Sequence, residues 1–448
     1  MKIVIAGAGE MGFHLANLLS KEAHDIVIID DSQEILNHVA NKLDVETIRG
    51  DSSSIDILNQ ANVGNADLLL SLTSSEQNNI ITSIVGKKMG VKRTIARDND
   101  NKYSIHPEQV AFFKQLGIDT LFSPRLLAAK EVVRLVSDAA LTDLFEFEGG
   151  KLCVVGIHIV DNNAFLLNKT LAETSQKFPT TGLRLIAILR DGETIIPRGS
   201  DKVLFNDNVY FIAQKDKIDA ILRLTGKKRI NIKNIMILGG STVGKLAAER
   251  LQKSYNVKLI EIDQAKSIAL AEYLTDTLVI NADGRDSDVL LEEDLPNIDV
   301  FLAVTNNTET NILSSLIAKK HGVAKTIAMV EGRDYITVSQ NIGVDTLINK
   351  KLITANNIFR HIRKGYVQAI TSLHGVDAEV IEFQVHANSK ITQHVIKDLR
   401  FPKNALIGGV IRGNESFIPT ADQQILNGDK VVVFVRPETI GEVEAFFE

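Results

Sequence analysis

Three glycines near the start of the chain have the spacing that holds a phosphate group. The segment KIVIAGAGEMG carries Gly7, Gly9 and Gly12 directly after a short apolar stretch. The first glycine allows a tight strand-to-helix turn, the second lets backbone amides approach a pyrophosphate, and the third lets helix and strand pack closely. The start of such a helix also attracts anions. We therefore expect a nucleotide phosphate to bind here.

A carboxylate follows at the spacing of a ribose contact. Asp30 comes directly after the apolar stretch 26–29, at about the twenty-residue separation that dinucleotide-binding units show. Its charge would repel a 2′-phosphate, so NAD-type or adenosine ligands are favoured over NADP. The alternative is that Asp30 is a solvated residue at a strand end.

Three further apolar stretches end in polar residues. Asp51 in IRGD would place a carboxylate near an adenine edge, Thr73 and Ser74 in LLLSLTSSEQNN would supply hydroxyls, and Arg97 in RTIAR would reach phosphate. Taken singly, Thr73 and Ser74 are more often helix caps than ligands. Open parallel sheets bind ligands at the carboxyl ends of their strands, so all these residues are expected to face one crevice.

The second half of the chain repeats the same landmarks. The segment NIMILGGSTVG places Gly239 232 residues after Gly7, and Glu261 takes the place of Asp30 with a one-residue gap. The same offset of 232 relates four further pairs: Gly12 and Gly244, Asp51 and Asp283, Thr73 and Thr305, and Asn79 and Asn311. This agreement predicts two copies of one nucleotide-binding domain.

The two copies differ where a phosphate would bind. Ser241 replaces the middle glycine, Ala282 replaces Gly50, and Met329 stands in the place of Arg97. A side chain at Ser241 crowds the approach of a pyrophosphate, and loss of the arginine removes a bidentate phosphate partner. We expect the first site to bind more tightly than the second.

A smaller repeat follows each nucleotide-type domain, in segments 186–212 and 408–434. An arginine, a proline seven residues later and an aspartate ten residues after that recur as Arg190, Pro197 and Asp207 and as Arg412, Pro419 and Asp429. Alternating apolar residues and turn dipeptides such as Asp191-Gly192 indicate short antiparallel strands. We predict a compact α+β lobe without a recognisable catalytic spacing.

The joints between these modules repeat as well. Segments 117–136 and 343–362 each run from a strand into an amphipathic helix, which either packs within one domain or crosses over to pair two domains. A polar basic stretch at 224–234 separates the halves. The expected fold is α/β: two tandem Rossmann-like domains with doubly wound parallel sheets, at 1–140 and 227–366, each followed by a small α+β lobe, at 141–226 and 367–448.

Composition narrows the possible classes of protein. The chain has 448 residues, 44% of them hydrophobic, and a net charge of −6 that gives no general attraction to nucleic acid. No apolar stretch approaches the roughly eighteen residues of a membrane-spanning helix. A strand at the very start leaves no signal peptide. The single cysteine, Cys153, excludes an internal disulfide and a cysteine-cluster metal site, and fits a reducing cytosol.

An enzyme is the less favoured interpretation. A nicotinamide dehydrogenase needs a general acid or base beside the hydride position, and the candidates His14, His24, His106 and His158 belong to no catalytic arrangement that the sequence supports. No catalytic or metal-binding residue is predicted. Binding without turnover is the expectation, and an NAD-dependent oxidoreductase is the alternative.

Together, GAGEMG, Asp30, Gly50-Asp51, LTSSEQNN, TIAR and the arginine-proline-aspartate lobe, all in duplicate, resemble the TrkA family of regulatory proteins of bacterial Trk potassium uptake. The resemblance covers essentially the whole chain. Each half looks like one RCK unit, a regulator-of-potassium-conductance module made of a nucleotide-binding domain and a C-terminal lobe.

The resemblance implies a regulatory function rather than catalysis. It implies a homo-oligomeric ring, a dimer or tetramer, bound peripherally in the cytoplasm beneath a TrkH- or TrkG-like membrane channel. It also implies NAD or NADH as ligand, with ATP or ADP in some members. A regulator of potassium efflux or of another carrier would share these domains, and a purely structural scaffold would keep the fold.

The expected cofactor-binding residues fall into two sets. Carried over from the family, the first site covers 7–11, Asp30, Thr73, Ser74 and Arg97, and the second covers 239–243 and Glu261. Gly12 is added from the glycine spacing, Asp51 from the strand-end pattern, and Thr305 from the repeat of Thr73. In full, the expected residues are Gly7, Ala8, Gly9, Glu10, Met11, Gly12, Asp30, Asp51, Thr73, Ser74, Arg97, Gly239, Gly240, Ser241, Thr242, Val243, Glu261 and Thr305.

Overall fold

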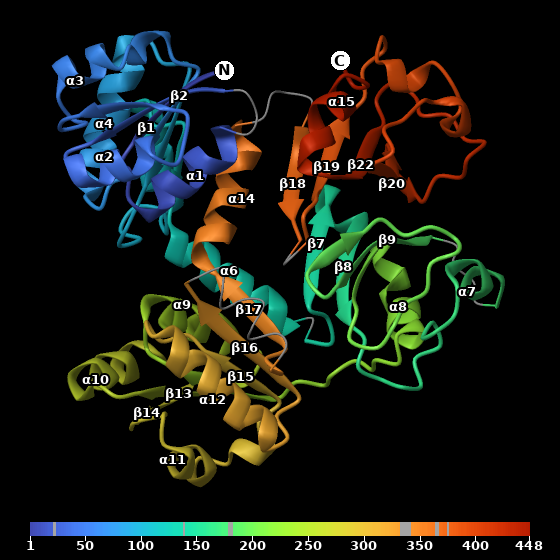
Figure 1. The fold of residues 1–448 in the computed structure, drawn as a ribbon. Helices are drawn as coiled ribbons and strands as arrows, with labels where there is room; N and C mark the ends of the chain where they lie inside the picture. Colours follow the sequence, from blue (N-terminus) through green and yellow to red (C-terminus); the bar gives the residue numbers. More distant parts are fainter. Residues whose placement is uncertain (21–23, 138, 178–181, 332–341, 363–366, 374–375) are drawn as a thin grey trace. The chain divides into compact units, whose positions relative to one another are not determined.

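The computed structural model describes residues 1–448 except 21–23, 138, 178–181, 332–341, 363–366 and 374–375. It contains four sheets, two parallel and two antiparallel, in alternation along the chain (Figure 1). The expected α/β fold with two Rossmann-like domains and two smaller lobes is confirmed. Position 366, the expected end of the third domain, lies outside the described residues.

The first sheet is parallel and has six strands in the order β3-β2-β1-β4-β5-β6. Its strands are β1 Lys2–Ala6, β2 Asp25–Asp30, β3 Glu46–Arg49, β4 Leu68–Ser71, β5 Arg93–Arg97 and β6 Thr120–Phe122. The helices between and after them are α1 Glu10–Ser20, α2 Gln33–Ala40, α3 Ile55–Gln60, α4 Glu76–Met89, α5 Pro107–Gln115 and α6 Pro124–Ser137. The strand order reverses between β1 and β4, which is where sheets of this type bind ligands.

The third sheet repeats that order as β14-β13-β12-β15-β16-β17. Its strands are β12 Asn234–Leu238, β13 Asn256–Glu261, β14 Thr277–Asn281, β15 Val300–Ala303, β16 Lys325–Val330 and β17 Thr346–Asn349. Its helices are α9 Thr242–Leu251, α10 Gln264–Tyr273, α11 Ser287–Glu292, α12 Thr308–Lys320 and α14 Lys350–Ile362. The central strands of both sheets are continuous buried apolar runs because helices cover both faces.

The two lobes are antiparallel sheets, ordered β10-β9-β11-β8-β7 and β18-β19-β22-β20-β21. The first lobe contains β7 Asp143–Phe147, β8 Leu152–His158, β9 Leu183–Arg190, β10 Glu193–Ile195, β11 Asn208–Ala213, α7 Leu171–Lys177 and α8 Ile218–Leu224. The second contains β18 Val367–Ser372, β19 Glu379–Gln384, β20 Ala405–Arg412, β21 Glu415–Phe417, β22 Lys430–Val435 and α15 Ile440–Glu444. The predicted Asp191-Gly192 turn joins β9 to β10, with both residues at positive φ.

The lobes are not independent of each other. Side chains from both build one buried cluster, in which Ile186, Tyr210 and Ile212 meet Val380 and Phe434. The Arg184 guanidinium donates hydrogen bonds across it to the carbonyls of Ile407, at 2.9 Å, and Pro419, at 2.5 Å. The two lobes therefore fold around a shared core.

By its internal contacts the chain divides into two compact units, residues 1–131 with 241–247 and 348–358, and the remainder. The start of α14 thus belongs with the first nucleotide-type domain, which favours the crossover interpretation of this joint helix over packing within its own domain. In the part of the chain that the structure describes, no helix has both the length and the apolar character needed to cross a bilayer.

Candidate functional site

The first glycine loop joins β1 to α1, and each of its three glycines has a different environment. Gly7 has φ +103°, and a Cβ there would lie 2.8 Å from the backbone nitrogen of Thr73. A Cβ at Gly12 would lie 1.8 Å from the Gly7 carbonyl oxygen. By contrast, a Cβ at Gly9 would meet no atom within 4 Å. Gly9 is therefore not required by packing among the described residues, and the open space beside it suits a ligand.

Asp30 at the end of β2 holds the same loop. Its Oδ2 accepts a hydrogen bond from the Ala8 amide at 2.7 Å, and its Oδ1 accepts one from the Ser32 amide at 3.0 Å. A carboxylate has about four acceptor positions, so the group keeps acceptor capacity for ribose hydroxyls. Asp51 lies in the neighbouring turn, where it is exposed and accepts hydrogen bonds from the Ser53 amide and hydroxyl.

The end of β4 is fixed by Asn79. Its Oδ1 accepts from the Thr73 amide at 2.8 Å and from the Thr73 hydroxyl at 2.7 Å, and its Nδ2 donates to the Arg97 carbonyl at 3.0 Å. Asn79 is fully buried. The Thr73 hydroxyl is thus committed to its own turn, and the Ser74 carbonyl accepts from Asn99 Nδ2. From the sequence, Asn79 was identified only as a residue that recurs in both halves. A polar residue on the buried face of a helix could have indicated that it holds the neighbouring turn.

Two arginines, Arg97 and Arg125, lie close to each other at the end of β5. Burial, and then the nearby Arg125 guanidinium, lower the pKa of Arg97. The Arg97 Nε is buried without a hydrogen-bond partner among the described residues, while Arg125 pairs with Asp100 at 3.2 Å. An anion beside Arg97 would relieve both the repulsion and the unsatisfied donor.

The same strand end carries a buried acidic pair. Burial, and then a hydrogen bond with Asp98, raise the pKa of Glu76. Burial also acts to raise the pKa of Asp98, but hydrogen bonds with Glu76, Ser104 and Tyr103 outweigh it and lower that pKa. The pair fixes the segment after Arg97, because the Asp100 amide donates to Glu76 Oε1 at 2.8 Å.

The second half repeats this construction. Gly239 has φ +103°, and a Cβ there would lie 2.8 Å from the Thr305 side chain. Thr305 and Asn311 reproduce the Thr73–Asn79 arrangement, with Asn311 Nδ2 donating to the Met329 carbonyl at 2.8 Å. The Gly240 amide donates to Glu261 Oε2 at 2.8 Å, as Ala8 does to Asp30.

Two differences weaken the second copy as an anion site. The Ser241 hydroxyl accepts a hydrogen bond from the Gly244 amide at 3.2 Å, so it occupies an amide that a phosphate would otherwise use. Lys266, on α10, forms an ion pair with Glu261 at 3.0 Å. The corresponding residue in the first half is Ile35, so Asp30 has no such cation. Sequence reasoning missed Lys266.

In each lobe, the arginine and the aspartate of the arginine-proline-aspartate repeat form an ion pair. Arg190 meets Asp207 with two hydrogen bonds of 2.8 and 2.7 Å, and Arg412 meets Asp429 with the same two distances. Both aspartates are 1% exposed. Each arginine also donates to a loop carbonyl on the strand-connecting segment. The arginine and aspartate of the motif therefore use their polar groups to fix a loop within the lobe, and we assign them no ligand.

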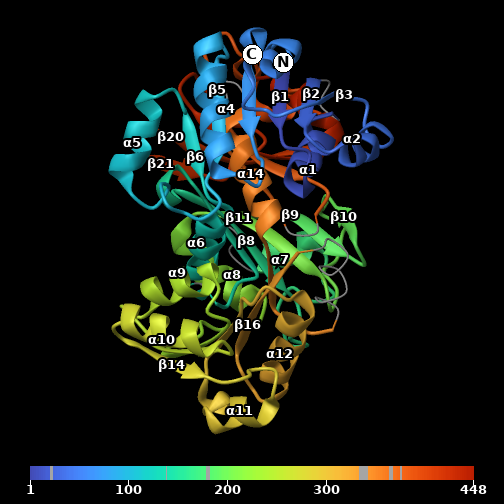
Figure 2. The same ribbon diagram turned by 90° about the vertical axis from the view of Figure 1, so that its left-hand side faces the viewer.

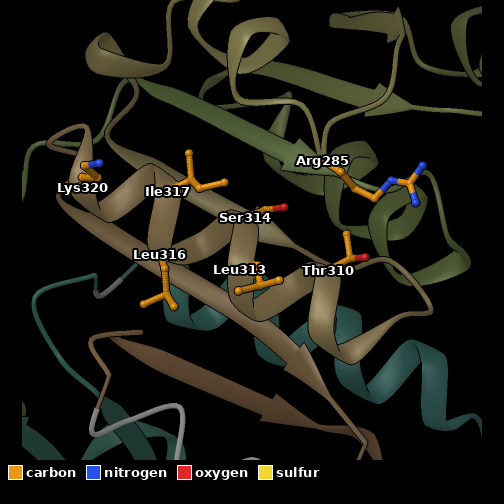
Figure 3. A pocket seen from close by; sticks show the side chains of 7 residues that line it. All are labelled: Arg285, Thr310, Leu313, Ser314, Leu316, Ile317 and Lys320. Carbon is orange, nitrogen blue, oxygen red and sulfur yellow. The ribbon is translucent and has the colours of Figure 1, made fainter.

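A hollow of about 400 Å³ lies along α12, lined by Arg285, Thr310, Leu313, Ser314, Leu316, Ile317 and Lys320 (Figure 3). None of the predicted nucleotide-binding residues lines it. Leu313 is 60% exposed there, and Ile81, at the same place on α4, is 46% exposed. The hollow is an apolar helix face rather than a nucleotide crevice.

Comparisons with known proteins agree with this organisation. TrkA-N domain models match residues 3–124 and 235–350, and TrkA-C domain models match 155–226 and 380–448. The Trk system potassium uptake protein TrkA of Haemophilus influenzae is 32% identical over all of this chain and 99% of its own length. TrkA homolog 1 of Methanosarcina mazei is also 32% identical, with both chains covered completely.

Solved structures show the same fold at lower identity. The GsuK RCK domain aligns with a TM-score of 0.62 at 15% identity, covering 99% of this chain and 94% of that one. The GsuK channel bound to NAD aligns with a TM-score of 0.60 at 16% identity, covering 100% and 78%. From the family models and the full-length relatives we conclude that this chain belongs to the TrkA family of Trk-system potassium uptake proteins.

Proposed function

We propose that this protein is the regulatory subunit of a Trk-type potassium-uptake channel and that it gates its membrane partner by binding a nucleotide. The observation that supports this most directly is a set of three groups at the carboxyl ends of the strands of the first sheet. They are an unobstructed Gly9, an Asp30 carboxylate fixed against the loop, and a half-buried Arg97 whose buried Nε lacks a partner among the described residues. These are the groups that a ribose and a phosphate require.

The proposed ligand is NAD or NADH, with ATP or ADP as alternatives that share the adenosine and phosphate. The first site comprises 7–12, Asp30, Asp51, Thr73, Ser74 and Arg97, and the second comprises 239–243, Glu261 and Thr305. Asp30 and the loop amides bind the ribose and phosphate, whereas Thr73 and Asn79 position the turn. The proposed modules are 1–140, 141–226, 227–366 and 367–448.

The proposed assembly is a homo-oligomeric ring, a dimer or tetramer, in the cytoplasm beneath a TrkH- or TrkG-like channel. Large apolar residues at equivalent exposed places, Ile81 on α4 and Leu313 on α12, support an interface between copies. A ligand that binds one conformation of such a ring more tightly than another shifts the ring toward that conformation, and the ring in turn acts on the gate of the channel. Each tenfold preference of a ligand for one ring conformation shifts the equilibrium by about 1.4 kcal/mol per site.

Calorimetric titration of the purified chain with NADH, NAD, ATP and ADP tests the ligand. At least one should bind with measurable heat, and an absence of heat and of any thermal shift for all four would remove the proposal. Potassium flux into liposomes that hold a TrkH-like channel tests the partner. Flux should depend on both this chain and the nucleotide that calorimetry identifies.

A further inference from the structure

A lysine from the second half of the chain reaches the first glycine loop. Lys351, the second residue of α14, places its Nζ 2.5 Å from Oε2 of Glu10, the first residue of α1. Both views draw α14 beside α1 (Figures 1 and 2), and both segments belong to the same compact unit. The pair therefore joins two segments that are 341 positions apart in the sequence.

The backbone that carries Lys351 is anchored. The Asn349 Oδ1 accepts hydrogen bonds from the Lys351 amide at 2.9 Å and the Leu352 amide at 3.2 Å, which caps the helix. Asn349 is 2% exposed, and Ala355 and Ile358 on the same helix are buried. Because the start of α14 is fixed, the Lys351 ammonium stays close to the loop.

Glu10 holds that ammonium only loosely. Its side chain is 77% exposed, against 28% for Lys351, and an exposed ion pair contributes little to stability. Standard bond lengths place the ammonium within ~7 Å of the Glu10 Cα, which is within reach of a phosphate on the loop amides. A doubly charged phosphate would compete effectively with the single carboxylate of Glu10.

We propose that Lys351 is a ligand for the phosphates of a nucleotide bound at the first loop, and that Glu10 keeps its ammonium in place until the nucleotide binds. This inference rests on the proposed function. The first site then favours ligands with more phosphate charge. The second loop has Thr242 in the place of Glu10 and therefore lacks this pair.

The test is calorimetric titration of the full chain, wild type and variants, with ADP, NAD and adenosine at low salt. Lys351→Met should weaken ADP binding about tenfold, the loss expected for one charge-assisted hydrogen bond. It should weaken NAD binding less, because each of its two phosphates carries one charge, and leave adenosine binding unchanged. Lys351→Arg, which keeps the positive charge, should retain the ADP affinity of the wild-type chain.

Lys42→Met is the matched control. The Lys42 Nζ lies 6.0 Å from the ring centre of Phe13 on α1, so this variant removes the same charge from the same region without touching the Glu10 pair. It should leave ADP affinity unchanged. Equal losses for the two methionine variants, or an equal loss for ADP and adenosine in Lys351→Met, would overturn the inference.

Glu10→Gln provides an independent measurement that does not depend on how Lys351→Met folds. The exposed substitution should leave the melting temperature unchanged and raise ADP affinity about threefold, because it removes a competing negative charge. An unchanged or lower ADP affinity contradicts the inference. If the wild-type chain binds none of the nucleotides, the proposed function itself fails, which is a different result from normal binding that the variants leave unaltered.

Discussion

At the scale of single residues, the glycines of the first loop separate packing from ligand binding. Gly9→Ala should leave the free energy of unfolding unchanged within ~0.5 kcal/mol, because its Cβ would enter open space, but it should weaken nucleotide binding. Gly12→Ala should destabilise the chain by about 3 kcal/mol, because its Cβ would collide with the Gly7 carbonyl. Denaturant unfolding and calorimetry measure the two effects. A stable Gly12→Ala variant would contradict the helix-strand contact.

Glu382 should make stability depend on pH. Its side chain is 2% exposed within the lobe core, and burial raises its pKa to about 7, with Lys430 lowering it and Glu148 raising it to a smaller extent. A carboxyl group whose folded pKa exceeds its unfolded value binds more protons in the folded state. Its contribution is therefore most favourable below pH ~4.5 and is lost as the pH rises to about 7.

Glu382→Gln removes this titration. The difference in free energy of unfolding between the variant and wild type should be about 2 kcal/mol more favourable to the variant at pH 8 than at pH 5.5. Denaturant unfolding at both pH values measures it. Glu415→Gln, on the exposed edge of the same lobe, is the control and should show no such difference. A pH profile of Glu382→Gln parallel to that of wild type would show that Glu382 is ionised in the folded lobe.

Some residues around the first and second loops could be predicted from the sequence and others could not. The positions of the glycine loop and of Asp30 beside it could be predicted because they depend on contacts between consecutive elements, β1, α1 and β2; their binding of a nucleotide stays a prediction. Lys351 could not be predicted, because it reaches Glu10 from a helix 341 positions away whose placement depends on tertiary packing. Lys266, by contrast, lies only five residues after Glu261, and its position in the sequence was an available signal. The Thr73 hydroxyl was expected at the ligand, but a local hydrogen bond to Asn79 uses it instead.

At the scale of elements, strand positions followed from apolar runs. The stretch expected at the start of the chain is β1 Lys2–Ala6, and the repeat offset placed β12 Asn234–Leu238 correctly. The shared core of the lobes could not be predicted, because alternating apolar residues show that a strand has a buried face without showing what covers it. Ile186 and Phe434, for example, belong to one buried cluster although they lie in different modules.

Removing the arginine from the ion pair in a lobe should destabilise the lobe strongly, because it leaves a buried carboxylate unpaired. Arg190→Met leaves the Asp207 carboxylate, 1% exposed, without its cation, which should cost about 3 kcal/mol. The control is Arg229→Met, which breaks an ion pair with Asp219 whose side chains are 70% and 51% exposed and should cost less than about 1 kcal/mol. Thermal unfolding of both variants measures the contrast. Equal changes in melting temperature would show that burial of Asp207 does not decide the cost.

At the scale of the whole molecule, the duplication separates two sites that share a framework but not their charges. The first has Arg97 with an unpartnered Nε, Lys351 beside the glycine loop, and an Asp30 that forms no ion pair with a lysine among the described residues. The second has the buried, apolar Met329, a Glu261 paired with Lys266, and a Ser241 that occupies a loop amide. Because affinity for a phosphate depends on free donors and net positive charge, the halves are expected to bind unequally, so that one responds at ligand concentrations that leave the other empty.

Paired substitutions at the ribose carboxylates test this asymmetry. Asp30→Ala should weaken the tighter calorimetric site at least tenfold, because it removes both a ribose acceptor and the hydrogen bond that orients the Ala8 amide. Glu261→Ala should leave that site unchanged. Ser241→Gly should strengthen the weaker site, since it frees the Gly244 amide. Equal losses for the two alanine variants would mean that both loops bind ligand alike, and the proposed ring would then respond to nucleotide over a single concentration range instead of two.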